Sequence, residues 1–342
     1  MKHSNISIFI PHAGCPHKCS FCNQKTISGA QKQPTAEEVH EICRKALEEV
    51  PDRKNCEIAF FGGSFTAIDR DYMISLLEAA KCYLGENGFF GIRISTRPDF
   101  IDREVLEILK SYGVTAIELG AQSMRNKVLQ LNERGHSVED VYNACDLIRE
   151  YGFELGLQMM VGLYGSSEKY ELDTRDRILK IRPDTVRIYP VVILEGTKLA
   201  ELYKSGEYEL MEFDHAVEVC ARILLKFEKH GIKVIKCGLH ASDGVEGEMI
   251  GGYYHPAFRE ICESDIYRKA IQKAVLEWNS GIGYIKIAKG ETYCYTIAVN
   301  PSCISKALGH KKSNVKFFRE MNIDIKVIGD EKIPKYQCEI RG

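Results

Sequence analysis

Three cysteines stand close together in one short segment of the chain. Cys15, Cys19 and Cys22 lie within HAGCPHKCSFC (12–22), directly behind the apolar run ISIFI (6–10). Thiolates are soft ligands that bind zinc or the irons of an iron–sulfur cluster. Proline, histidine and lysine interleave the three thiols, and a loop of this composition does not bury cysteines in a core. The spacing therefore predicts a metal site behind the first strand.

The number of thiols bears on which metal they bind. A structural zinc site normally has four ligands, usually as two separated pairs, and the sequence offers no clear second pair. A [4Fe–4S] cluster is usually held by four cysteines, so three cysteines leave one iron open for another ligand. A zinc knuckle completed by His12 or His17 is the alternative.

The composition sets the broad class of protein. The chain has 342 residues, 44% of them hydrophobic, a net charge of −2 and 13 cysteines. An odd number of cysteines in a long chain without an export signal favours reduced thiols over a disulfide framework. The near-neutral charge argues against binding polyanions over the whole surface, although a local basic patch can still bind RNA. Because no apolar run approaches the roughly 18 residues of a membrane span, we expect a cytoplasmic protein with no membrane partner.

Strand-like and helix-like segments alternate through the first two thirds of the chain. Such alternation predicts an α/β fold with a parallel sheet. The pattern stops short of a complete barrel and predicts a partial (βα)6 TIM-like barrel, with its chemistry at the C-terminal ends of the strands. The predicted strands are 6–10, 57–63, 91–96, 116–122, 154–162, 185–191 and 233–239.

The pattern changes after about residue 240. We expect residues 1–240 to form the barrel, 241–285 a linker or lid that contains GGYYHPAFRE (251–260), and 286–342 a small C-terminal α+β unit. The last part has the pattern of one strand, two helices and two further strands.

Further segments match one known family in order along the chain. The spacing Cys15-x3-Cys19-x2-Cys22, with Phe21 before the last cysteine, resembles the cluster loop of radical S-adenosylmethionine (SAM) enzymes. The other matching segments are FFGGSF (60–65), STRPD (95–99), ELGAQS (118–123), NERGHSVEDV (132–141), MMVGLYG (159–165) and IYPVVILEGTKLAELYKSGEY (188–208). Together they resemble the radical SAM domain of the Elongator catalytic subunit and, more distantly, oxygen-independent coproporphyrinogen III oxidase. We expect no acetyltransferase domain like that of the Elongator subunit, because too few residues follow.

The resemblance implies a [4Fe–4S] cluster on the three cysteines and SAM on its open iron. The residues that it assigns to cofactor binding are Phe21, Gly62, Gly63, Ser64, Ser95, Gln122, Arg134 and Gly162. A glutamine suits the ribose hydroxyls, and an arginine suits the methionine carboxylate through a charge-assisted fork. Ser64 and Ser95 depart from the family pattern, in which acids are found at these positions.

The resemblance also implies an enzyme and its reaction type. A reduced cluster cleaves SAM to methionine and a 5′-deoxyadenosyl radical, which abstracts hydrogen from a substrate. An electron donor such as flavodoxin or ferredoxin is then expected as a partner. A non-catalytic iron–sulfur or RNA-binding protein is the alternative from another class.

Substrate residues are expected after the barrel. Tyr253, Tyr254, His255 and Arg259 follow a Gly-Gly pair in GGYYHPAFRE and are our candidate catalytic residues, because a lid there can reach the barrel mouth. An ordinary packing loop between domains explains the same residues equally well.

The C-terminal unit suggests a nucleic-acid substrate. ISKALGHKKSNVKFFREMNIDIKVIGD (304–330) resembles a KH-type RNA-binding core, in which helix, G-x-x-G loop and helix clamp a nucleotide backbone. The expected RNA-binding residues are Gly309, Lys311, Lys312 and Lys316, with Lys312 where the second glycine belongs. We therefore expect tRNA or another RNA as partner. A solvated lysine-rich helix and a small-molecule substrate, such as a tetrapyrrole precursor, are the alternatives.

Overall fold

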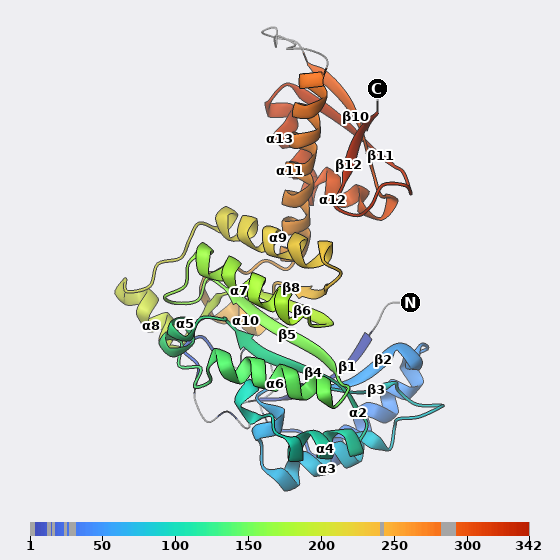
Figure 1. The fold of residues 1–342 in the computed structure, drawn as a ribbon, viewed down its shortest axis with the longest axis vertical. Coiled ribbons are helices and arrows are strands. Elements are labelled where there is room, and N and C mark those ends of the chain that lie inside the picture. The colour runs from blue at the N-terminus through green and yellow to red at the C-terminus, as the bar shows by residue number, and fades with distance from the viewer. Residues whose placement is uncertain are drawn as a thin grey trace.

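Seven parallel strands form one curled sheet, a half-barrel, in the computed structural model, which describes residues 4–11, 15, 18–23, 26, 32–239, 243–281 and 292–341. The strand order is β1-β2-β3-β4-β5-β6-β8 (Figure 1). The strands are β1 (Ser4–Ile10), β2 (Cys56–Gly62), β3 (Gly91–Thr96), β4 (Val114–Gln122), β5 (Glu154–Val161), β6 (Thr185–Pro190) and β8 (Lys233–Cys237). The predicted partial barrel is confirmed, and each of its seven strands corresponds to one of the seven predicted strands.

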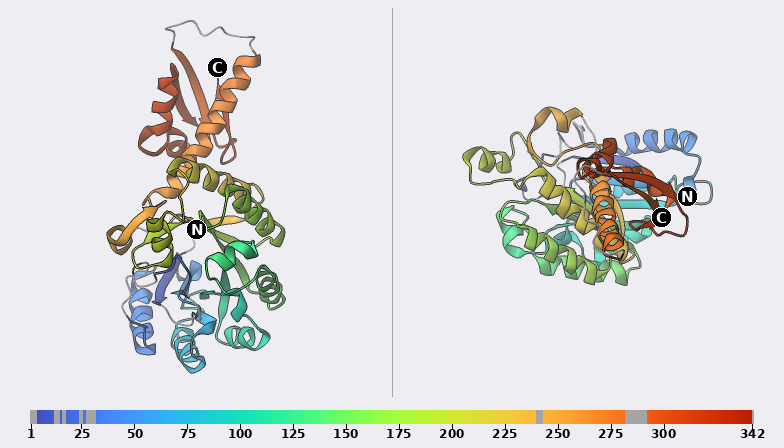
Figure 2. Two further views of the ribbon diagram at one scale, coloured as in Figure 1. Left: turned by 90° about the vertical axis from the view of Figure 1, so that its left-hand side faces the viewer. Right: turned by 90° about the horizontal axis from the view of Figure 1, so that it is seen from above.

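Helices cover the convex side of the sheet (Figures 1 and 2). The longer ones are α2 (Ala36–Glu49), α3 (Arg70–Lys81), α4 (Arg103–Ser111), α6 (Val138–Glu150), α7 (Glu168–Ile181) and α9 (Phe213–Lys229), and the shorter ones are α5 (Asn126–Leu131) and α8 (Lys198–Ser205). Side-chain N-caps such as Thr35 and Ser137, each in a capping box, fix where these helices begin. Three 3₁₀ turns lie beside the strands: η1 (Arg53–Asn55), η2 (Phe65–Ala67) and η3 (Pro98–Phe100).

The two faces of the sheet differ in chemistry. Residues such as Ile58, Ile94 and Leu157 are buried in the hydrophobic core. The alternate positions carry charged side chains, among them Arg93 and Arg187, which side-chain hydrogen bonds connect to glutamates of neighbouring strands. Because side chains alternate between the faces of a sheet, the core lies on one face and an ion network on the other.

A small two-stranded sheet adjoins the half-barrel. β7 (Val192–Leu194) pairs antiparallel with β9 (Met249–Gly252), which follows α10 (Asp243–Glu248). The predicted flexible Gly-Gly pair, Gly251 and Gly252, lies inside β9 and is held in register with β7. The next long element is α11 (Phe258–Gly281), so part of the expected lid is regular secondary structure.

The C-terminal unit has a three-stranded sheet in the order β11-β10-β12. Its elements are β10 (Tyr293–Val299), η4 (Pro301–Cys303), α12 (Ile304–Leu308), η5 (His310–Lys312), α13 (Ser313–Glu320), β11 (Ile323–Gly329) and β12 (Cys338–Arg341). The predicted strand, helix, helix, strand, strand sequence is therefore present. Helix α11 contacts both α9 and β12 and connects the half-barrel to this unit (Figures 1 and 2). The division of the chain at residues 240 and 285 stays a prediction.

Among the residues that the structure describes, no helix has both the length and the apolar character needed to cross a bilayer.

Candidate functional site

The cysteine loop follows β1, at the C-terminal ends of the strands. Cys19 is buried, Cys22 is half-buried with its N–H 3.1 Å from the Cys19 carbonyl oxygen, and Cys15 is exposed. Within the described ranges, no three His, Cys, Asp or Glu side chains are arranged as metal ligands. His12 and His17, the alternative zinc ligands, lie outside the described residues.

Cys15 faces the ends of the neighbouring strands. Partial desolvation raises the pKa of its thiol, and Cys19 raises it further, while Arg97 and Arg134 oppose the shift. The backbone of Ser64 also hydrogen-bonds this thiol and lowers its pKa. Cys15 and Cys19 are thus neighbours, and two guanidinium groups are close enough to stabilise thiolates at this position.

The loop is anchored by a residue pair that the sequence analysis missed. Ser20, between the second and third cysteines, is fully buried and donates its hydroxyl to Asn132 Oδ1 at 2.9 Å. Its N–H donates to the Asn132 carbonyl at 3.1 Å, and its carbonyl accepts from Leu199 N at 2.8 Å. The Asn132 amide in turn donates to Val128 O and Tyr164 O. A buried polar pair therefore fixes the loop to α5, and Phe21 beside it packs partly buried against the core.

Arg134 connects the loop to the end of β4. Its Nη1 lies 3.1 Å from Cys19 Sγ, and its Nη2 donates to Gly120 O at 2.6 Å. Gln122 is close by, because a Cβ added at Gly120 would lie 2.9 Å from Gln122 Nε2 and 3.2 Å from Arg134 Nη2. Gln122 has a positive φ of 61° at an irregularity of the β4–β5 register. The structure thus brings two predicted SAM contacts together beside a cysteine.

Buried polar atoms without a hydrogen-bond partner gather at this end of the sheet. Among the described residues they include Ser95 Oγ, Arg97 Nη1, Gln122 Oε1, Arg134 Nε and His136 Nδ1. Buried polar groups are almost always paired, so a set of unpaired ones next to a cysteine loop indicates a place for a polar ligand. An amino acid, a ribose and a base, as in SAM, supply donors and acceptors that match them.

Arg97 and His136 belong to this set but were not predicted. Burial and the Arg134 guanidinium lower the pKa of His136 to about 4, so its imidazole is neutral at neutral pH. Its Nε2 lies 3.3 Å from Ala121 O. Both residues were visible in the sequence, inside the matching segments STRPD and NERGHSVEDV, but nothing in the pattern separated them from their neighbours.

The predicted Gly-Gly-Ser segment ends β2 beside the end of β1. Gly62 has a φ of +113°, and an added Cβ would lie 2.8 Å from Ile10 O, so only glycine fits there. Gly63 N donates to the same oxygen at 2.8 Å. The Ser64 hydroxyl lies 2.8 Å from Thr96 Oγ1 and accepts from Arg97 N at 3.1 Å. Ser64 therefore uses its side chain to connect β2 to β3.

Gly162, after β5, is enclosed by protein side chains. It has a φ of +87°, and an added Cβ would lie 2.6 Å from Cε2 of buried Tyr253. Its N–H donates to Glu171 Oε1 at 2.5 Å, and its carbonyl accepts from the Tyr208 hydroxyl. The Tyr253 ring thus occupies the space directly beside Gly162.

A pocket of about 250 Å³ lies at this turn and includes Glu171, Tyr208 and Tyr253 among its lining residues. Burial raises the pKa of Glu171 to about 7, although the Gly162 N–H opposes the shift. The sequence analysis did not single out Glu171, because it stands in an ordinary helical pattern.

The four candidate catalytic residues point to different parts of the molecule. Tyr253 packs on Gly162, whereas the Tyr254 hydroxyl donates to Glu246 at 2.9 Å. The His255 ring accepts from Ala257 N and lies 5.3 Å from the His310 ring. Arg259 donates to Val234 O at 2.5 Å and to Glu263 at 3.2 Å. The structure does not bring these four side chains together.

The four candidate RNA-binding residues share one end of the C-terminal unit. Gly309, Lys311 and Lys312 lie between α12 and α13, and Lys316 lies on α13. Lys311 and Lys312 are exposed and have positive φ values of 51° and 61°. Two consecutive lysines in this region of φ are uncommon, since glycine adopts it far more easily.

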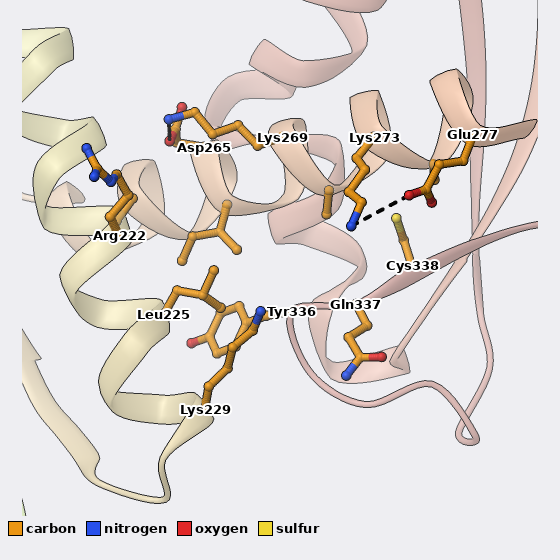
Figure 3. A pocket seen from close by; sticks show the side chains of 14 residues that line it. Arg222, Leu225, Lys229, Asp265, Lys269, Lys273, Glu277, Tyr336, Gln337 and Cys338 are labelled. Atoms are coloured by element: carbon orange, nitrogen blue, oxygen red, sulfur yellow. Dashed lines mark ion pairs between the residues drawn. The ribbon is translucent and has the colours of Figure 1, made fainter. Parts of the chain in front are cut away.

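A second pocket, of about 380 Å³, lies where α9, α11 and residues 336–338 meet (Figure 3). Lys273 pairs with Glu277 at 3.6 Å, and Lys269 pairs with Asp265 at 3.1 Å. Tyr336 is tied to α11, because its N–H donates to the Tyr267 hydroxyl at 2.8 Å. Because residues of α9, α11 and 336–338 all line it, this pocket lies at the contact between the half-barrel and the C-terminal unit.

Two family models match the chain. The model of the radical SAM superfamily matches residues 9–178, and the model of the Radical_SAM C-terminal domain matches residues 183–268. The first range contains the three cysteines and the unpaired polar atoms, and the second contains β6 to β9 and the start of α11.

Curated proteins also resemble this chain over part of its length. The tRNA uridine(34) acetyltransferase of Methanocaldococcus jannaschii is 33% identical over 195 residues, which cover 51% of this chain and 36% of that protein. Human Elongator complex protein 3 is 31% identical over 188 residues, 49% of this chain and 34% of that protein. An uncharacterized protein of M. jannaschii is 30% identical over 222 residues, 62% of this chain and 68% of that protein. The chain thus spans about a third of the length of the two relatives with named activities or complexes.

A solved structure supports the fold. The archaeal Elp3 of Methanocaldococcus infernus, with its N-terminus deleted, matches 78% of this chain and 63% of its own, with a TM-score of 0.63 and 21% sequence identity. Radical SAM proteins use a [4Fe–4S] cluster and SAM, and the cysteine loop and the unpaired polar atoms beside it fit these two groups. The chain belongs to the radical SAM superfamily.

Proposed function

We propose that this protein is a radical SAM enzyme that cleaves SAM reductively and uses the resulting radical to modify tRNA. The observation that carries the proposal is the set of unpaired buried polar atoms beside Cys19, at the C-terminal ends of β3 and β4. Parallel (βα) folds place their chemistry at this end.

The three cysteines are the residues that would hold the cluster, with Ser20 and Asn132 fixing the loop between them. When bound, the cluster would supply one electron for the reductive cleavage of SAM to methionine and a 5′-deoxyadenosyl radical. An electron donor such as flavodoxin or ferredoxin supplies that electron. The protein's own contribution is to position the reacting groups and exclude water.

Four of the residues with an unpaired buried atom have a chemical character that suits part of SAM. Arg134 and Arg97 have unpaired guanidinium N–H groups that suit a carboxylate. Gln122 has an unpaired acceptor, Oε1, and Ser95 an unpaired hydroxyl, which suit an amine or ribose hydroxyls. These assignments extend the sequence prediction, and they make Arg97 a new member of the set.

The choice of tRNA rests on two observations. Relatives from M. jannaschii, M. infernus and Dehalococcoides mccartyi are described as tRNA uridine(34) acetyltransferases. The C-terminal unit also presents Lys311, Lys312 and Lys316 on its exposed surface, where they can contact phosphates. The family model that matches residues 9–178 is that of the radical SAM superfamily, so we propose the radical chemistry and not the acetyl transfer.

The cluster and the cleavage of SAM are tested together. Anaerobically reconstituted protein should contain about four irons per chain and form 5′-deoxyadenosine from SAM with dithionite. Cys19→Ala should abolish the product, whereas Cys82→Ala, which removes an exposed thiol far from the loop in sequence, should leave it unchanged. Wild-type protein that forms no 5′-deoxyadenosine would contradict the proposed reaction.

The substrate is tested in cells. Modified nucleosides of tRNA from wild-type and deletion strains should differ in at least one species, and the wild-type gene should restore it while Cys19→Ala should not. Identical nucleoside profiles would contradict tRNA as the substrate.

A further inference from the structure

Two phenylalanines lie side by side on the inner face of the sheet, which is the face opposite the covering helices. Phe9 of β1 and Phe61 of β2 are partners in register, and partners in parallel strands point to the same face. Their ring centroids are 6.3 Å apart, with 44° between the ring planes. Arg187, which belongs to the ion network of the inner face, lies over the Phe61 ring at 5.1 Å from its centroid. We call Phe9 and Phe61 the aromatic pair.

Phe9 is the more accessible member of the aromatic pair. It is 36% exposed, whereas Ile8 and Ile10 on either side of it in β1 are 2% exposed and belong to the core. Phe61 is half-buried. A ligand that covered Phe9 would remove apolar surface from water, which is favourable. A single exposed phenyl ring is ordinary, so its surroundings have to indicate whether it binds a ligand.

The aromatic pair is held in place from across the half-barrel. Three strands, β3, β4 and β5, separate β2 from β6 in the sheet order, yet Arg187 of β6 reaches Phe61. Hydrogen bonds from Nε and Nη2 of Arg187 to Glu118, at 2.5 and 2.8 Å, fix the guanidinium. A guanidinium over the face of a phenyl ring is attractive. Phe61 is thus fixed in position, and it supports the ring of Phe9 beside it.

The aromatic pair adjoins the buried atoms that have no hydrogen-bond partner. Phe60 of β2 is paired with Ile94 of β3. The next residues of these two strands, Phe61 and Ser95, are therefore neighbours on the inner face. Among the described residues, Ser95 Oγ is one of the buried atoms without a partner. A group that contacts the aromatic pair would thus lie beside the place that the proposed function gives to SAM.

A hydrogen-bonding side chain lies on the same face. Gln158 of β5 is the register partner of Arg187 and is half-buried. Its Nε2 donates to Glu118 Oε2 at 3.2 Å, which fixes the carboxamide, and its Oε1 is an acceptor. Aromatic rings and a carboxamide on one face suit a flat ligand with polar edges better than an aliphatic one.

We propose that Phe9, supported by Phe61, stacks on one base of the RNA substrate and holds that base beside the SAM site. The inference rests on the proposed function, because it takes RNA as the substrate. Proteins that bind unpaired nucleotides stack the bases on aromatic side chains, since every base has a flat face that can stack. Gln158 supplies an acceptor for the edge of the stacked base.

Substitutions that separate an aromatic ring from an apolar side chain test the inference. Binding of tRNA to the reconstituted protein is measured by fluorescence anisotropy. We expect Phe9→Leu to weaken binding about tenfold, because loss of one stacked base has an effect of this order. Phe9→Tyr keeps the ring and should bind like wild type. The control is Phe90→Leu, since Phe90 is 61% exposed and precedes β3, at the opposite end of the strands.

Competition experiments show whether Phe9 acts on the base or on the phosphates. A single-stranded RNA of random sequence and an abasic ribose–phosphate chain of the same length each displace labelled tRNA. Wild type should bind the RNA with bases more tightly than the abasic chain, and Phe9→Leu should reduce this difference about tenfold. Melting curves and iron content confirm that each variant is folded and reconstituted.

Three results would overturn the inference. The first is wild-type tRNA affinity in Phe9→Leu, and the second is an equal loss in Phe9→Leu and Phe9→Tyr, because packing and not stacking would then be affected. The third is a loss of SAM affinity in Phe9→Leu with unchanged tRNA binding, since the ring would then hold the adenine of SAM. Formation of 5′-deoxyadenosine by wild type without RNA is measured in parallel. Its absence overturns the proposed function, whereas its presence with unchanged tRNA binding by Phe9→Leu overturns the stacking alone.

Discussion

The inner face of the sheet has two polar regions that differ in one respect, which is whether their buried groups are paired. Toward the N-terminal ends of the strands, Arg93 donates to Glu57 at 2.6 Å and to Glu154 at 2.8 Å, and Arg187 binds Glu118 through two nitrogens. At the C-terminal ends, Ser95, Arg97, Gln122, Arg134 and His136 each keep an unpaired buried atom. We call the first region the floor and the second the rim.

This difference in pairing indicates a separate role for each region. A buried charge is tolerated only when it is paired, so the complete pairing of the floor stabilises the fold without any ligand. Unpaired buried groups destabilise a fold, and they persist where a ligand completes them. Substitutions should therefore affect stability at the floor and ligand binding at the rim.

The largest effect is expected at the floor. Arg93→Met should lower the free energy of unfolding by about 3 to 5 kcal/mol, because it leaves Glu57 buried without its cation. Urea unfolding of the purified protein measures this. Arg103→Met removes an exposed pair with Glu150 and should change the free energy of unfolding far less, because solvent screens that pair. If Arg93→Met lowers the free energy of unfolding no more than Arg103→Met does, the buried ion pairs of the floor stabilise the fold no more than an exposed pair.

Glu171 combines features of both regions, since one oxygen accepts from Gly162 N and the carboxyl is otherwise desolvated. Its pKa is raised from 4.5 to about 7, so the folded protein holds this proton more tightly than the unfolded chain. Its contribution to stability is complete below pH 4.5 and is lost as the pH rises to 7, by up to about 3 kcal/mol.

Glu171→Gln should remove that part of the pH dependence, whereas Glu49→Gln, an exposed carboxyl on α2, should keep it. Unfolding free energies at several pH values between 4.5 and 7 provide the measurement. Parallel curves for wild type and Glu171→Gln would show that the carboxyl titrates normally in the folded protein.

The anchor of the cysteine loop should give the next largest effect. Asn132→Ala leaves the Ser20 hydroxyl and the Tyr164 carbonyl unpaired and should destabilise the protein by about 2 kcal/mol. Reconstituted protein should also retain less iron, since the loop loses its attachment. Asn87→Ala, at an exposed position, serves as control. Full iron content in Asn132→Ala would mean that the loop holds its shape without α5.

The smallest change in stability is expected at Ser95, in the rim. Ser95→Ala removes a hydroxyl that has no protein partner, so the melting temperature should stay within experimental error. SAM affinity of the reconstituted protein, measured by equilibrium dialysis, should fall about fivefold, near 1 kcal/mol. Ser64→Ala should lower the melting temperature, because Thr96 and Arg97 N lose a hydrogen-bond partner. Equal melting temperatures for both variants would contradict the assignment of rim residues by their unpaired atoms.

The strands were predicted well because each carries a strong local pattern. β3 and the predicted segment 91–96 coincide, and β2 differs by one residue at each end. The cysteine spacing likewise needs no knowledge of distant residues. Such features depend on neighbours in the sequence, which a single chain displays directly.

Side-chain contacts between different strands could not be predicted from the sequence. The sequence around Glu118 does not distinguish it from a surface glutamate. In the structure it is buried and accepts a hydrogen bond from Arg187, which stands 69 positions further along the chain. Ser64 matched a ligand position in sequence, but its partners Thr96 and Arg97 come from β3 and the residue after it. Tyr253 was assigned to a lid, and only the tertiary structure places its ring on Gly162.

The outer edge of β8 has a consequence for how the molecule associates with itself. A half-barrel leaves its terminal strands with unpaired backbone groups, and such edges invite pairing with a second chain. At Val234 the N–H donates to Glu228 at 3.2 Å and the carbonyl accepts from Arg259 at 2.5 Å, so both backbone groups are bound by side chains of α9 and α11. At Val234, side chains of α9 and α11 thus occupy the groups that a strand of a second chain would need for pairing.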